Sequence, residues 1–387
     1  MKMPRSKRGK SGLVSAGVIA ILLPISSQCT NSIPVLKQNS PVEHVVVSRQ
    51  DSYIFVTAKL GSKTLRMFLD SADLQSRVAI TSLPTDFHGK NVELKVGSLD
   101  LNVERAEPSD LAGFLKNYKS VDGELGASFL SKCAVGIDYE NPHSTMELWP
   151  GGVNKAAAEE WIAANSGRKT DVVDLKVGHH DRVAFTALIQ NVPFEMCVDT
   201  GATATALSDE RPIPKEWSLI INGSASGYGG DIQAKIYLPD FLKAGAYSFL
   251  NRCVCQVPIG ANIFSPCGSG VPRVVIDFKD EKMYLPEPNG VQEDWDWALT
   301  GLFGWHFVFK NDAITIDRAY YGGPTDIYQI ESIGDLKAEQ ILGAWKDPKT
   351  AHSVLTRLLQ LTVPGNYANG TKNGQPFRTP VPALLGN

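Results

Sequence analysis

Short apolar runs separated by polar turns dominate this chain and predict many short strands. Apolar and polar residues alternate within most of these runs, which is the period of a strand with one buried face. The chain contains 34 glycines and 23 prolines, residues that end strands and form turns. This pattern predicts a mainly all-β fold and disfavours a helical bundle.

Two of the apolar runs end on an aspartate. Residues 65–69 lead into Asp70, and residues 194–198 lead into Asp199. After each aspartate come a hydroxyl residue and a small residue: Ser71 and Ala72 in the first copy, Thr200 and Gly201 in the second. A further strand and turn, residues 55–61 and 185–190, precede the two runs in the same relation. The two halves of the chain therefore look like copies of one unit.

Two such turns can place two carboxylates face to face. Carboxylates a few ångströms apart cannot both ionise, so they share one proton. The ionised carboxylate can then deprotonate a water molecule while the protonated one polarises a carbonyl, which is general acid–base hydrolysis of an amide. A strand that ends on Asp-Ser or Asp-Thr is also compatible with an ordinary strand end or helix cap.

The pattern downstream of each aspartate resembles that of the aspartic proteases, in which a later apolar-apolar-Gly segment braces the Asp turn of each lobe. Leu125 and Gly126 match the end of this brace in the first copy. The full brace of the second copy is assigned to the segment at 302–304, which consists of Leu302, Phe303 and Gly304. Residues 122–130 are also similar to a run in the compact bacterial relatives of retroviral proteases.

The resemblance covers roughly residues 45–317 and implies a bilobal pepsin/retropepsin-like fold with Asp70 and Asp199 as the catalytic dyad. It implies that Ser71, Ala72, Thr200, Gly201 and Thr203 support the dyad and that no cofactor is needed. The glycine-rich stretch at 224–230 is interpreted either as a flap with Tyr228 at its tip or as a plain hairpin turn.

The first copy departs from the family pattern at three positions. Ala72 stands where glycine is usual, and Leu74 replaces the hydroxyl that Thr203 supplies in the second copy. Asp73 adds a negative charge that we expect to raise the pKa of Asp70.

The apolar and glycine-rich patterns divide the chain into five segments. We expect a signal peptide at 1–28, a first protease-like lobe at 41–150, a helical connector at 151–170 and a second lobe at 171–324. Residues 325–387 carry helical spacing at 333–345 and 350–362 and end in a Gly-, Asn- and Pro-rich stretch. They are interpreted as a short helical appendage with a disordered tail.

The N-terminus has the pattern of an export signal. Five Lys and Arg lie within the first ten residues, and an apolar stretch follows at 13–25. We therefore expect a periplasmic, secreted or lipid-anchored protein. The sequence leaves open whether Cys29 is lipidated or whether cleavage near Ser27 leaves it close to a free N-terminus.

The remaining cysteines and the net charge bear on three questions: disulfide bonds, a metal site and a nucleic-acid partner. Cys253 or Cys255 could form a disulfide with Cys267, or all three could remain reduced. No histidine lies near them at ligand spacing, so no metal site is expected. The net charge of −3 and the scattered basic residues argue against a nucleic-acid partner.

These observations favour a monomeric aspartic endopeptidase that acts on peptides or proteins. The first alternative is an inactive protein of the same fold that binds peptides or envelope partners. The second is an exported β-rich binding protein in which the two Asp turns are coincidental. The chain contains no Gly-x-Ser-x-Gly and no His-Glu-x-x-His motif, which disfavours the serine and zinc hydrolases that use them.

Overall fold

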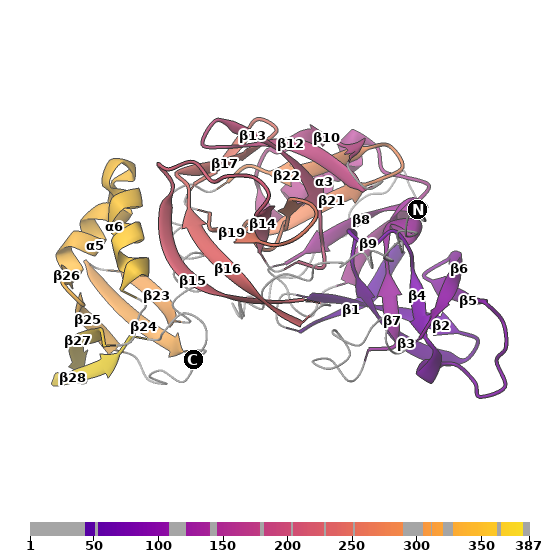
Figure 1. The fold of residues 1–387 in the computed structure, drawn as a ribbon, viewed down its shortest axis with the longest axis horizontal. Helices are drawn as coiled ribbons and strands as arrows, with labels where there is room; N and C mark the ends of the chain where they lie inside the picture. The colour runs from indigo at the N-terminus through magenta and orange to yellow at the C-terminus, as the bar shows by residue number, and fades with distance from the viewer. Residues whose placement is uncertain are drawn as a thin grey trace, which may run out of the picture.

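The computed structural model describes residues 43–50, 53–107, 121–139, 145–178, 182–202, 204–227, 230–250, 252–288, 305–310, 312–319, 328–361 and 365–381. The fold is mainly β, as the sequence predicted. The molecule is elongated, with residues 43–150 (the first half) at one end, residues 305–381 (the C-terminal unit) at the other, and residues 170–286 (the second half) between them (Figure 1).

The first half is built from nine strands. They are β1 (Glu43–Gln50), β2 (Tyr53–Leu60), β3 (Lys63–Leu69), β4 (Arg77–Ala79), β5 (Asn91–Val96), β6 (Leu99–Ala106), β7 (Gly123–Leu125), β8 (Cys133–Asp138) and β9 (Thr145–Pro150). A 3₁₀ turn, Ile80–Ser82, follows β4, and a one-turn helix, α2 (Ala127–Leu130), follows β7. Strand β3 pairs with β2 antiparallel and with β7 in parallel, so the end of β3 lies inside the sheet.

The second half contains thirteen strands. They are β10 (Thr170–Asp174), β11 (Lys176–Val177), β12 (Val183–Ile189), β13 (Val192–Val198), β14 (Thr205–Ser208), β15 (Ser218–Gly227), β16 (Gly230–Leu238), β17 (Phe241–Ala244), β18 (Tyr247–Leu250), β19 (Val254–Val257), β20 (Ile263–Phe264), β21 (Arg273–Asp277) and β22 (Lys282–Pro286). Strand β13 pairs with β12 antiparallel and with β20 in parallel, which repeats the pairing of β3.

The two halves share one sheet. Its strands run in the order β10-β22-β21-β8-β9-β1, so that three strands of each half meet at the antiparallel pair of β21 and β8. The hairpin of β21 and β22 therefore occupies in the second half the place of β8 and β9 in the first.

The connector between the halves contains the expected helix, α3 (Lys155–Ser166). The side chain of Asn154 accepts a hydrogen bond from the Ala157 backbone N–H at 2.9 Å, which caps the first turn. Gly167 ends the helix in the left-handed conformation with φ of 67°. Trp161 of the helix packs edge-on against Trp149, with 6.3 Å between ring centroids, and fixes the helix on the shared sheet.

The C-terminal unit is a sheet with two helices, and not the helical appendage that the sequence suggested. Its elements are β23 (Trp305–Lys310), β24 (Ala313–Ala319), β25 (Tyr328–Ile333), β26 (Leu336–Lys337), α5 (Ala338–Lys346), α6 (Pro348–Gln360), β27 (Tyr367–Lys372) and β28 (Gln375–Pro380). Strands β23 and β24, which the sequence assigned to the segment ending at 324, pair with this sheet. The predicted helices are present, but the first begins at 338 because the preceding residues pair as β25 and β26.

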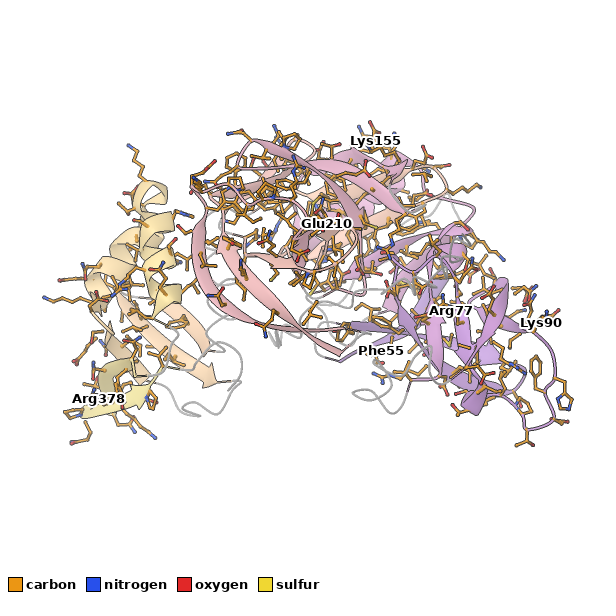
Figure 2. All side chains as sticks on the ribbon, viewed as in Figure 1. Phe55, Arg77, Lys90, Lys155, Glu210 and Arg378 are labelled. Atoms are coloured by element: carbon orange, nitrogen blue, oxygen red, sulfur yellow. The ribbon has the colours of Figure 1, made fainter. Side chains whose placement is uncertain are left out.

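The stretch at 367–380, expected to belong to a disordered tail, forms the hairpin of β27 and β28. Asn373 and Gly374 form its turn with φ of 51° and 77°, the left-handed conformation that an Asn-Gly turn adopts. The Arg378 guanidinium lies 3.8 Å from the centre of the Tyr367 ring in this hairpin, at the opposite end of the molecule from Arg77 (Figure 2).

The C-terminal unit shares an apolar core with the second half. This core joins Ile236 of β16 and Cys255 of β19 to Leu355 and Leu358 of α6. His352 of α6 also lies 3.1 Å from the Asp240 carboxylate, which belongs to the turn after β16. A separate, larger core fills the space between the sheets of the first and second halves. The burial of these apolar side chains is the main contribution that stabilises the two halves, and with them the turns at Asp70 and Asp199.

Candidate active site

The two aspartates lie at equivalent places, each directly after the end of a central strand. Asp70 follows β3 and is 2% exposed, and Asp199 follows β13 and is 1% exposed. A side-chain hydrogen bond links Asp199 to Asp70. The structure therefore brings together two carboxylates that are 129 residues apart in the sequence, as the paired motifs predicted.

Each aspartate is held by the strand that pairs in parallel with its own. The Asp70 N–H donates to the Leu125 carbonyl at 3.0 Å, at the end of β7. The Asp199 N–H donates to the Phe264 carbonyl at 2.9 Å, at the end of β20. The first brace, Leu125 and Gly126, lies where the sequence placed it.

The second brace differs from the expectation. Leu302, Phe303 and Gly304 lie outside the described residues, and β20, which ends at Phe264, takes the place assigned to them. Ser265 stands where the first brace has Gly126, so the apolar-apolar-Gly signal is absent. A Cβ on Gly126 would meet the Gln75 carbonyl oxygen at 2.4 Å, which requires glycine there, whereas the second half accommodates a serine.

A second pair of hydroxyl residues secures each brace. Ser76 accepts a hydrogen bond from the Gly126 N–H at 2.9 Å, and Thr205 accepts one from the Ser265 N–H at 3.2 Å. Both hydroxyls lie six residues after their aspartate. This pair was not predicted from the sequence, although its equal spacing from the two aspartates would have identified it.

Ser71 and Thr200 connect the two turns directly. The Thr200 hydroxyl accepts a hydrogen bond from the Ser71 N–H at 3.0 Å and donates one to the Leu69 carbonyl at 3.1 Å. The Ser71 hydroxyl accepts from the Thr200 N–H at 2.8 Å and donates to the Val198 carbonyl at 2.8 Å. The four bonds form a symmetric lock in which each half positions the aspartate of the other.

The small residues after the hydroxyls let the backbone approach the carboxylates. The Ala72 N–H donates to Asp70 Oδ1 at 3.0 Å, and the Gly201 N–H donates to Asp199 Oδ1 at 2.8 Å. A Cβ on Gly201 would lie 2.8 Å from Asp70 Cγ, so this glycine is required by the closeness of the other turn. Ala72 is buried at 3% exposure, and its methyl group fits on the first side.

Burial of the pair changes its acidity. Burial is the largest cause that raises the pKa of Asp70 to about 6 from its usual 3.8, and the charge of Asp73 is the second. Backbone N–H groups of Ala72 and Asp73 and the charge of Arg182 oppose this shift. Burial followed by the charge of Asp70 raises the pKa of Asp199 well above its usual value. The expected effect of Asp73 is confirmed in direction, and the shifts match a pair that retains a proton near neutral pH.

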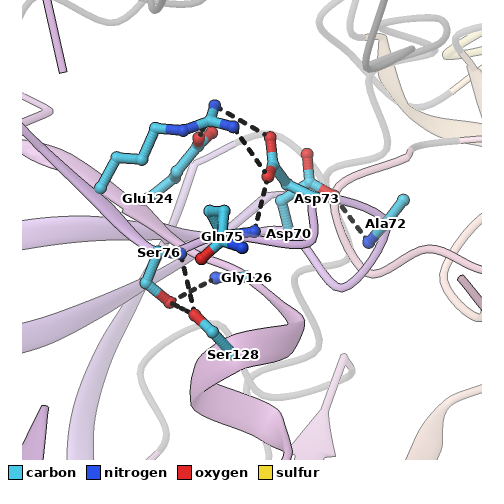
Figure 3. Close-up of polar contacts among 9 residues, drawn as sticks. Asp70, Ala72, Asp73, Gln75, Ser76, Glu124, Gly126 and Ser128 are labelled. Atoms are coloured by element: carbon cyan, nitrogen blue, oxygen red, sulfur yellow. Dashed lines mark hydrogen bonds and ion pairs between the residues drawn. The ribbon is translucent and has the colours of Figure 1, made fainter. Parts of the chain in front are cut away.

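An ion network lies behind Asp70 (Figure 3). The Arg77 guanidinium contacts both carboxylate oxygens of Asp73, at 3.1 and 3.2 Å, and Oε1 of Glu124 at 2.7 Å. Asp73 and Glu124 are buried, so Arg77 neutralises charges that would otherwise be costly. This network ties the Asp70 turn to β4 and β7.

Three predicted positions remain: Leu74, Thr203 and Tyr228. Leu74 has no side-chain hydroxyl that could donate to Asp70, and the Asp73 N–H donates to the main-chain carbonyl of Asp70 at 3.2 Å. Thr203 and Tyr228 lie outside the described residues. Around Tyr228, β15 and β16 form a hairpin whose last described pair is Gly227 with Gly230, so a hairpin at this place is confirmed.

The hairpin of β15 and β16 belongs to the architecture around Asp199. Strand β16 pairs with β19, and β19 pairs in parallel with β14, the strand that follows the Asp199 turn. In the first half, β5 and β6 make the same connection to β4. Strand β15 is an addition of the second half.

The five described cysteines are buried and none of them forms a disulfide, which contradicts the disulfide alternative for Cys267. Burial raises the pKa of Cys197 and Cys255 to about 12, so these thiols stay protonated. In the described part of the chain, no cluster of His, Cys, Asp and Glu side chains has the arrangement of a metal site. None of the described helices is both long and apolar enough to cross a membrane.

Comparison with protein-family models and with curated proteins finds no match for this chain. The function is therefore inferred from the geometry of the site.

Proposed function

We propose that the protein is an aspartic endopeptidase with two lobes, formed by the first and second halves. The observation that carries this proposal is the symmetric lock of Ser71 and Thr200, which holds Asp70 and Asp199 in hydrogen-bonded contact. An ordinary strand end or helix cap would not require reciprocal bonds between two distant turns. The shared sheet supports the assignment, because it relates the halves by an approximate two-fold arrangement.

The reaction needs one proton on the pair. The ionised carboxylate accepts a proton from a water molecule, whose oxygen forms a bond to the carbonyl carbon of the peptide. The protonated carboxyl donates its proton to the carbonyl oxygen, which gives a neutral tetrahedral diol. Proton transfer to the amide nitrogen then accompanies cleavage of the C–N bond and release of an amine and a carboxylic acid. No cofactor takes part in this sequence.

Access to the carboxylates requires movement, because both are nearly completely buried. The long hairpin of β15 and β16 is the element we propose as the flap, since it is added on the Asp199 side. The same burial favours the alternative, a protein of this fold that binds peptides without cleaving them. Cleavage distinguishes the two.

The test is digestion of an unfolded protein such as reduced casein. We expect cleavage by the wild type and a loss of about 10²- to 10⁴-fold in both Asp70→Asn and Asp199→Asn. Asp209→Asn, at an exposed position, is the matched control and should retain activity. Pepstatin, whose hydroxyl mimics that of the tetrahedral state, should inhibit the wild type. Full activity in Asp199→Asn would exclude the dyad, and pepstatin binding without cleavage would support the inactive alternative.

We also propose that the chain is exported, from the basic and apolar pattern of its first 25 residues. Mass spectrometry of the mature protein tests this. A diacylglyceryl group on Cys29 would indicate a lipoprotein, a free terminus near Gln28 would indicate secretion, and an intact Met1 would contradict both.

A further inference from the structure

The two strand hairpins that carry the aspartates match residue for residue. Phe55 pairs with Phe68 in the first, and Ala184 pairs with Cys197 in the second, in each case two residues before the aspartate. The same register continued by two residues sets Tyr53 opposite Asp70 and Arg182 opposite Asp199. Directly opposed residues of an antiparallel pair project from the same face of the sheet. Tyr53 and Arg182 are therefore equivalent positions beside the two carboxylates.

The surroundings of the two aspartates differ at these positions. Beside Asp70, Tyr53 packs edge-on against Phe68 with 5.4 Å between ring centroids, and Phe55 lies 5.9 Å from the same ring. These three aromatic residues form an apolar cluster with Val121. Beside Asp199, the matching positions hold Ala184 and Cys197, which are small, and Arg182, which is charged. The second side therefore carries two small side chains and a cation where the first carries three aromatic rings.

The Arg182 side chain is poised to bind an anion. The residue is 8% exposed, and within the described residues its guanidinium has no hydrogen bond or ion pair. None of the Arg182 side-chain nitrogens is both fully buried and without a hydrogen bond. Because the guanidinium makes no hydrogen bond to a described residue, its nitrogens contact solvent. A buried stem with an open, unpaired guanidinium suits the bidentate recognition of a carboxylate.

The dyad itself does not satisfy this guanidinium. The charge of Arg182 lowers the pKa of both Asp70 and Asp199, but no atom of either carboxylate lies within ion-pair distance of it among the described contacts. Arg182 thus lies near the reacting groups without being neutralised by them. A peptide bound across the dyad would bring its own side chains to this position.

We propose that Arg182 forms an anion-binding subsite on the Asp199 side, which takes the carboxylate side chain of a substrate residue close to the bond that is cut. The proposal rests on the endopeptidase function above. Because Tyr53 holds the equivalent position on the other side, the preference for an acidic residue applies to one side of the bond only. The protein then selects peptides with a Glu or Asp on that side.

The experiment uses matched fluorogenic peptides that carry Glu, Gln or Lys in turn at each position flanking the cleaved bond. At about pH 6.5 a glutamate side chain is ionised. We expect the wild type to cleave one Glu peptide at least tenfold more efficiently, in kcat/KM, than its Gln counterpart. Arg182→Met should remove this preference and still cleave the Gln peptide, and Arg182→Glu should favour the Lys peptide.

Two further variants complete the design. Arg182→Lys keeps the charge but loses the bidentate geometry, so we expect it to prefer the Glu peptide less strongly than the wild type does. This variant also tests the subsite if Arg182→Met does not fold. Lys215→Met, at an exposed position of the same half, is the control and should keep the wild-type preference. An equal rate for Glu and Gln peptides in the wild type, or an unchanged preference in Arg182→Met, would overturn the subsite. Failure of the wild type to cleave any peptide would instead count against the endopeptidase function.

Discussion

Ser71 and Thr200 each accept a hydrogen bond from the other's backbone N–H, at 2.8 and 3.0 Å. Both residues are buried, so the donors have no access to water if the hydroxyls are lost. The relationship makes two distant turns a single unit, because a displacement of one turn breaks the bonds that hold the other. The positions of the two carboxylates depend on this unit.

Removal of either hydroxyl should therefore destabilise the protein. We expect Ser71→Ala and Thr200→Val each to lower the free energy of unfolding by about 1–3 kcal/mol, since each leaves a buried N–H unpaired. The loss of unfolding free energy in the double variant should be smaller than the sum of the two single losses by about 0.5–2 kcal/mol, because each single variant already disturbs the bonds that the other removes. Urea unfolding measures all three. Ser131→Ala, at an exposed position, should change the stability by less than about 0.5 kcal/mol, and strictly additive losses at Ser71 and Thr200 would contradict the coupling.

The acidity of the pair sets the pH range of activity. Catalysis needs one ionised carboxylate, and the pair becomes doubly protonated below its lower pKa. Because the pKa of Asp70 is raised to about 6 and that of Asp199 well above its usual value, activity should fall below about pH 6. The kcat/KM of an uncharged peptide, measured from about pH 3 to 9, should rise with a midpoint near 6. A midpoint near the ordinary 3.8 would show that burial does not control the pair.

The same shift predicts how stability depends on pH. The pKa of Asp70 in the folded protein lies above its unfolded value, so its contribution to stability is complete below pH 3.8 and is lost as the pH rises through about 6. Asp70→Asn, which cannot ionise, should therefore be more stable than the wild type at pH 7.5, on the order of 2–3 kcal/mol. At pH 3.5 the two proteins should unfold at similar urea concentrations. Asp209→Asn should show no such difference at either pH.

The network behind Asp70 makes a further prediction. Arg77→Met leaves the buried carboxylates of Asp73 and Glu124 without their cation, so the protein should lose about 2–4 kcal/mol of stability at pH 7. Urea unfolding at pH 7 checks this. Arg105→Met, which removes only the pair with Glu107, should have almost no effect, and a loss of similar size in both variants would argue against a special cost of the buried carboxylates.

The sequence by itself identified the local features of the candidate site. An apolar strand, an aspartate, a hydroxyl and a small residue are consecutive, so the two turns at Asp70 and Asp199 could be predicted from their pattern. The first brace at Leu125 and Gly126 was also predictable from its apolar-Gly pattern, and the structure shows that this glycine has no room for a Cβ. Helix α3 followed from its Ala-rich stretch and its terminal Gly167. In each case, neighbouring residues carry the information.

Only the tertiary structure decided which distant segments pair. The second brace is a two-residue strand that ends at Phe264 without a glycine, and its parallel pairing with β13 depends on contacts across the chain. The C-terminal sheet depends likewise on the pairing of β24 with β25 and of β25 with β27. Arg182 resembled any other charged residue in the sequence and lies beside the dyad only because of the register between β12 and β13. Local pattern specifies a strand and its turn, whereas register and packing, which are properties of the whole fold, determine what lies next to them.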